Sequence, residues 1–144
     1  MIDGLTNAGS IPVLERMAQF AGARHRLITH NVANLSTPEF RPVDVSVDLF
    51  RSQLRAAVEQ RREDRPNGSG PLELEPTDEI TFTEDGLQME PKPIGENILF
   101  HDRNDRDLER TMQDLAENFM VYRQAMDLLR NRYQLLNQAI RERL

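Results

Sequence analysis

An apolar stripe in the last third of the sequence, over residues 107–142, constrains the fold more than any other feature. Large apolar residues alternate there in steps of four and three, and no Gly or Pro interrupts them. This spacing predicts one helix of roughly 50 Å, at about 1.5 Å of rise per residue. An apolar stripe with charges outside it is typical of coiled-coil packing. The stripe consists of Leu108, Met112, Leu115, Phe119, Tyr122, Met126, Leu129, Tyr133, Leu136 and Ile140.

Burial of this stripe is expected on energetic grounds. A large apolar side chain contributes roughly 1.5–3 kcal/mol when it is buried, and a long exposed stripe promotes aggregation. The internal partner that we expect is an N-terminal helix from about Ser10 to Asn34. Its own stripe is shorter and is interrupted by Arg24 and Asn31, so it cannot cover the longer one. The surplus predicts contacts with neighbouring subunits, and the packing residues expected in the N-terminal helix are Leu14, Met17, Ala21 and Ile28.

The ends of the N-terminal helix are predicted from local signals. Ser10 suits an N-cap, and Pro12 is tolerated in a first helical turn. Pro38 disfavours the helical conformation at the residue before it. We therefore expect the helix to end near Asn34, with Asn34 in the left-handed conformation that terminates many helices.

A shorter second helix is predicted over residues 44–63, with Asp44 and Ser46 as candidate caps. The charged run at residues 61–65 is expected to be solvated. Prolines and glycines exclude a long helix from residues 66–104. Within that segment, Ile80–Thr83 and Leu87–Met89 flank Asp85-Gly86, which predicts a small hairpin.

The predicted fold is therefore mainly α. Long N- and C-terminal helices pair as a coiled coil, and the middle segment holds a short helix with an irregular stretch or a small β-hairpin. The predicted segments are 1–40 for the N-terminal helix, 41–104 for the middle and 105–144 for the C-terminal helix, whose start Asn104, Asp105 and Asp107 would cap.

Composition excludes several classes of function. The net charge of −6 argues against nucleic acid as a partner. The absence of Cys excludes disulfides and thiolate chemistry. No apolar run approaches the ~20 residues of a membrane span, and residues 1–10 do not have the pattern of a cleavable signal peptide.

No arrangement of reactive residues points to an enzyme. His25 and His30 are five residues apart, so they do not share a helix face as a pair four apart would. The carboxylates form no acid–base frame, and there is no Gly-rich phosphate loop. We expect no catalytic, cofactor-binding or metal-binding residues.

The segment from Asn31 to Phe40 resembles the N-terminal signature of bacterial flagellar rod and hook proteins. In that family a helix ends in Asn-Ile/Val-Ala-Asn, followed by two variable residues, Thr-Pro, Gly and an aromatic. The matching positions are Asn31, Asn34, Thr37, Pro38 and Phe40, whereas Glu39 stands where Gly is usual. The C-terminal segments 107–110 and 115–118, followed by Tyr122-Arg123, resemble the ending of the short proximal rod members, the FlgB type.

The resemblance implies a structural subunit of the basal-body rod, which would transmit torque across the periplasm. It implies export by the flagellar type III system without signal cleavage. The implied partners are other copies of the chain, other rod proteins of the FlgC and FlgF types, the adaptor FliE, the ring protein FliF and the export gate. Placement one step further along the rod, as for FlgC, stays open.

Two other interpretations are consistent with the stripe alone. A stand-alone coiled-coil adaptor or export chaperone would carry the same helix, but it would not explain the Thr-Pro signature. A small helical enzyme is disfavoured by the absence of a reactive constellation.

Overall fold

A computed structural model describes residues 9–64, 70–83, 86–94 and 108–142. These residues form three helices and two small antiparallel sheets, so the fold is mainly α as predicted. The helices are α2 (Ile11–Asn34), α3 (Val47–Asp64) and α4 (Leu108–Arg141). The strands are β1 (Val43–Asp44), β2 (Ile80–Thr83), β3 (Gly86–Met89) and β4 (Lys92–Pro93).

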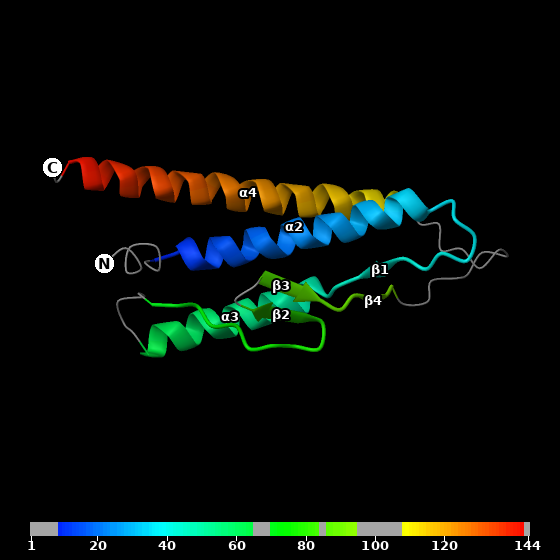
Figure 1. Ribbon diagram of the computed structural model, residues 1–144, viewed down its shortest axis with the longest axis horizontal. Coiled ribbons are helices and arrows are strands. Elements are labelled where there is room, and N and C mark those ends of the chain that lie inside the picture. The colour runs from blue at the N-terminus through cyan, green and yellow to red at the C-terminus, as the bar shows by residue number, and fades with distance from the viewer. Residues whose placement is uncertain (1–8, 65–69, 84–85, 95–107, 143–144) are drawn as a thin grey trace.

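The elements form three layers, with α2 in the middle (Figure 1). Helix α4 runs along one side of α2 in the opposite direction. Helix α3 and the β2–β3 hairpin cover the other side of α2. Because α2 has 24 residues and α4 has 34, the longer helix cannot be matched along its whole length.

The predicted boundaries of α2 are confirmed, but two details at its ends are wrong. Ser10 occupies the N-cap position without a side-chain capping bond, and Pro12 lies in the first turn. Asn34 is not left-handed, since the only non-glycine residue with positive φ in the described chain is Glu39. Leu35 is the C-cap and its N–H donates to the Val32 carbonyl at 3.4 Å, while Asn34 Nδ2 donates to the His30 carbonyl at 2.9 Å.

Helix α3 begins where the cap residues predicted it. The Leu49 N–H donates to Ser46 Oγ at 3.1 Å, which is an N-cap bond. Asp44 is not a cap but lies in β1. The expectation of a solvated charge run is wrong for Arg61, which is buried and donates to the Gly9 carbonyl at 3.0 Å. Arg65 lies outside the described residues.

The predicted hairpin is confirmed, with Ile80 opposite Met89 and Thr83 opposite Gly86. Its connection, including Asp85, lies outside the described residues. A second sheet was not predicted: β1 pairs antiparallel with β4, where Val43 faces Pro93. Proline within the short strand β4 hid it from prediction, because proline is rare in strands except at edges.

The main apolar core lies between α2, α3 and the hairpin. Its buried residues are Phe20, Val45, Phe50 and Ile80. The rings of Phe20 and Phe50 stack with centroids 3.9 Å apart. The core thus combines residues from the predicted N-terminal and middle segments, and no residue of α4 belongs to it.

Candidate assembly interface

Helix α4 carries the apolar surface that the subunit leaves uncovered. Every exposed large hydrophobic side chain among the described residues lies on this helix. Only Asn118 and Ala125 of α4 are buried. The exposed set is Leu108, Met112, Phe119, Met120, Val121, Tyr122, Met126, Leu128, Tyr133, Leu135 and Ile140.

The residues of α4 that face α2, here called the seam, differ from the predicted stripe. The seam contains the buried Asn118 and Ala125 together with the half-buried Leu115, Leu129 and Leu136. Of the predicted stripe, Leu115, Leu129 and Leu136 are in the seam, and Tyr122, exposed on one side, touches α2 at Gly22. The other six residues of the predicted stripe, Leu108, Met112, Phe119, Met126, Tyr133 and Ile140, are exposed at 36–50%.

Two rows of exposed apolar residues flank the seam, each with one residue every seven positions. Residues seven apart lie on nearly one line along a helix. Row A adjoins the Leu115 line and consists of Met112, Phe119, Met126, Tyr133 and Ile140. Row B adjoins the Asn118 line and consists of Val121, Leu128 and Leu135.

The seam differs from the predicted stripe because of the side chains that α2 presents to α4. On the side of α4, α2 presents small residues, and a side-chain carbon added at Gly22 would lie 3.4 Å from Tyr122 Cε2. The large side chain of Phe20 is committed to the core on the other side. Of the N-terminal residues predicted to pack, Leu14, Ala21 and Ile28 are buried and Met17 packs against the core.

Polar contacts set the register between α2 and α4. Asn118 Nδ2 donates to the Ala21 carbonyl at 2.8 Å within the buried seam. Further along, the Tyr133 hydroxyl donates to Glu15 Oε1 at 2.7 Å, and this bond raises the pKa of the Tyr133 phenol. A buried Asn in a helix–helix contact favours one register, because any slip leaves its amide unpaired.

Arg24 joins three elements at the other end of this contact. Its guanidinium makes a two-pronged pair with Asp44 of β1, with Nε–Oδ1 at 3.0 Å and Nη2–Oδ2 at 2.6 Å. The same Nη2 lies 4.0 Å from Asp114 Oδ1 of α4. Removal from water raises the pKa of the Asp114 carboxyl, and Arg24 partly offsets that rise. Arg24, which interrupts the apolar stripe of the N-terminal helix in the sequence, is therefore a buried link between α2, β1 and α4.

Asn31 ties the segment after α2 back onto the helix. Its side chain is 2% exposed. Its Nδ2 donates to the Val43 carbonyl at 2.8 Å, and its Oδ1 accepts from the Val43 N–H at 3.2 Å. Both backbone groups of one β1 residue are thus satisfied by one amide.

The turn after α2 is built from the remaining signature residues. The Thr37 N–H donates to the Asn34 carbonyl at 2.9 Å, and the Phe40 N–H donates to the Thr37 carbonyl at 3.3 Å. Glu39 adopts φ 60°, the left-handed region that favours glycine. The half-buried Phe40 ring meets His30 edge-on at 5.8 Å, whereas Thr37 and Pro38 are exposed. The structure thus gathers these residues into one corner.

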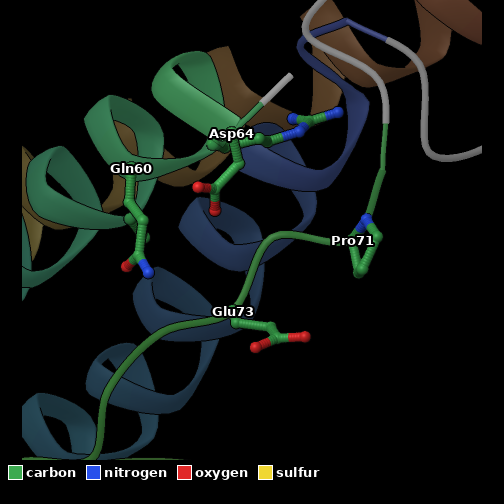
Figure 2. A pocket seen from close by; sticks show the side chains of 6 residues that line it. Gln60, Asp64, Pro71 and Glu73 are labelled. Atoms are coloured by element: carbon green, nitrogen blue, oxygen red, sulfur yellow. The ribbon is translucent and has the colours of Figure 1, made fainter.

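A polar pocket lies at the end of α3, between this helix and the segment before the hairpin (Figure 2). Gln60 and Asp64 project from α3, while Pro71 and Glu73 line the pocket from the facing segment before the hairpin. Among the described residues, neither a His nor a Ser lines this pocket. Within the described ranges there is no group of three or more His, Asp or Glu side chains that could hold a metal ion.

No helix in the described part of the chain is both long and apolar enough to cross a membrane. Comparison with known proteins identifies no relative: no protein-family model matches the chain, and no curated protein or solved structure is detectably similar to it.

Sequence reasoning missed Asn118 and Ala125 in the seam and the Arg24–Asp44 pair. The pattern at Thr111, Asn118 and Ala125 repeats every seven residues but is not hydrophobic, so an apolar periodicity cannot find it. The available signal was the small residues of α2, including Gly22, which allow close approach of another helix. The predicted caps Asn104, Asp105 and Asp107 lie outside the described residues.

Proposed function

We propose that this chain is a structural subunit that assembles with copies of itself into a helical array, as a flagellar proximal rod protein of the FlgB type. The observation that carries the proposal is the apolar surface of α4, which is confined to one helix and left uncovered by the subunit. Contiguous exposed apolar surface in a soluble chain marks an interaction site. In this proposal α2 and α4 pair as an antiparallel coiled coil, which stiffens the subunit so that it can transmit torque.

The geometry of the signature segment supports the more specific assignment. Glu39 is left-handed at the position where the rod and hook family usually has Gly. Asn31 and Asn34, the two asparagines of the signature, both hold backbone groups around the turn. These roles explain why a family would keep such residues at this spacing, and they do not depend on catalysis.

The proposed setting follows from the same resemblance. The subunit would be exported by the flagellar type III system into the periplasmic part of the basal body. Its partners would be other copies, rod proteins of the FlgC and FlgF types, FliE, FliF and the export gate. The chain would act without a cofactor and would not be an enzyme.

Deletion of the chain in its flagellated host tests this function. We expect loss of rod and filament, with inner-membrane rings still present in electron micrographs of purified basal bodies. Normal motility of the deletion strain would overturn the proposal. A stand-alone adaptor or export chaperone would be absent from purified basal bodies, whereas a rod subunit would be retained in them.

Complementation with two neighbouring variants tests the role of the α4 surface. Phe119→Asp places a charge in row A, whereas Met120→Asp places it on the outer side of α4, where the side chain is 70% exposed. We expect Phe119→Asp to abolish motility and Met120→Asp to restore it, with both proteins equally helical and equally exported. Equal motility of the two strains would show that row A is not used in assembly.

A further inference from the structure

Rows A and B form two separate apolar edges on α4. The Leu115 and Asn118 lines face α2, row A adjoins the first line, and row B adjoins the second. Between the rows, on the outer side, runs a line that consists of Gln113, Met120, Asp127 and Gln134, where Met120 is the one apolar residue. One straight neighbouring helix cannot cover both edges, because they lie on opposite sides of the seam.

The subunit itself leaves a shallow groove beside each edge. On the side of row A, Met126 lines a groove together with Ala18, Gly22 and Leu87. On the side of row B, Val121 lines another groove together with Phe50 of α3. Each edge is therefore open to a neighbour, and each has its own apolar wall.

We infer that row A of one copy packs against row B of the next copy, so that α4 helices lie side by side in one layer. This inference rests on the proposed self-assembly and identifies the surfaces that meet. Both rows repeat every seven residues, or about 10.5 Å along a helix, so their side chains can alternate along one contact. A contact between unlike surfaces repeats without closing on itself as a twofold dimer does.

Coverage favours this pairing over the symmetrical ones. If row A met row A in a twofold dimer, row B would stay exposed in every copy. If row B met row B, the five residues of row A would stay exposed, each at 36–50%. The unlike contact covers both rows with a single kind of interface in every copy except those at the ends of the layer, whereas the symmetrical contacts would need two kinds of interface.

Charge favours the same pairing along the stretch where the two rows overlap. Arg123 and Arg130 follow row A residues by one turn and form its outer margin. Arg110 and Glu117 lie seven residues apart on the outer margin of row B, one charge of each sign, and Arg123 lies 3.9 Å from Asp127 within the subunit. A contact of row A with itself brings the arginines of two copies together, whereas an unlike contact places Glu117 on the side of these arginines.

Cross-linking of single-cysteine variants tests the inference, because the chain contains no Cys of its own. Met126→Cys marks row A, Leu128→Cys marks row B, and Met120→Cys marks the outer side. A tagged and an untagged variant are mixed at equal concentration and treated with a short bis-maleimide, whose reach tolerates a small axial offset. Circular dichroism first verifies that each variant keeps the helical content of the parent chain.

We expect the mixed Met126–Leu128 product to exceed either self-linked product several-fold, with little product from Met120→Cys. A dominant Met126–Met126 product would overturn the inference in favour of a twofold contact. Equal products from all three positions, or none from any, would also overturn it. Motility of the deletion strain complemented with Met126→Cys or Leu128→Cys decides the rod proposal separately. If both cysteine variants restore motility while the Met126–Met126 product dominates, the proposed self-assembly stands and only the pairing of the rows fails.

Discussion

Replacement of Asn31 by alanine should destabilise the subunit more than any other single change in the corner after α2. Asn31 is the first asparagine of the signature and is 2% exposed. Its amide holds both the N–H and the carbonyl of Val43. The variant removes both bonds at once and leaves β1 attached mainly through Asp44 and β4.

The magnitude follows from the environment of the two bonds. Each intramolecular hydrogen bond contributes about 0.5–1.5 kcal/mol net, and a buried group left unpaired costs about 1–3 kcal/mol. Val43 is half-buried, so water can reach part of its backbone and the lower values apply. Alanine regains about 0.5 kcal/mol of helix propensity. The net loss in the free energy of unfolding should be about 2 kcal/mol.

Urea unfolding followed by circular dichroism measures this loss. Asn34→Ala is the matched control, because it removes a hydrogen bond to the His30 carbonyl in an exposed setting. That control should cost less than about 1 kcal/mol. If Asn31→Ala costs no more than Asn34→Ala, the bonds to Val43 do not hold the corner and the role given to the signature is wrong.

Three further changes test other contacts. Glu39→Gly should raise the free energy of unfolding by about 1 kcal/mol, because φ 60° is strained for a residue with a side chain and not for glycine. Urea unfolding measures this gain, and an unchanged midpoint would show that the turn relaxes. Gly22→Ala should raise the melting temperature, since alanine gains about 1 kcal/mol in a helix and its Cβ would lie 3.4 Å from Tyr122, an ordinary contact; a lower melting temperature would show that α2 and α4 cannot accommodate the methyl group. Glu79→Gln should destabilise the chain at neutral pH and lose this effect in acid. The hydrogen bond from the Ser46 N–H, together with Lys92, lowers the pKa of Glu79, so the carboxylate stabilises the fold above its unfolded pKa and ceases to do so as the pH falls through its folded pKa. A loss of stability that is equal at all pH values would contradict the role of the charge.

The elements of the fold were predictable because their signals are local. The ends of α2, the start of α3 at Ser46 and the hairpin with Ile80 opposite Met89 follow from capping, proline and turn chemistry. The β1–β4 sheet was not predictable in the same way. It joins residues about fifty positions apart, and its strands have only two residues each.

The sequence predicted that the last helix carries a candidate apolar interface, but it did not predict which residues of that helix face α2. Apolar periodicity placed large side chains along one side of α4, but it could not say which neighbouring line would face α2. That choice depends on Gly22 and the other small residues of α2, and on Asn118, whose amide is satisfied only against the Ala21 carbonyl.

The sequence by itself determined a long uninterrupted helix with more apolar surface than the rest of the chain can cover. Hydrophobic periodicity is a property of one helix, so it needs no knowledge of the partner. Only the tertiary structure decided that Arg24 and Asn31 are buried cross-links rather than interruptions, since their partners Asp44 and Val43 lie after a turn. It also decided that Asn118 and Ala125 are buried against α2, whereas the residues of row A lie beside this contact and stay exposed at 36–50%.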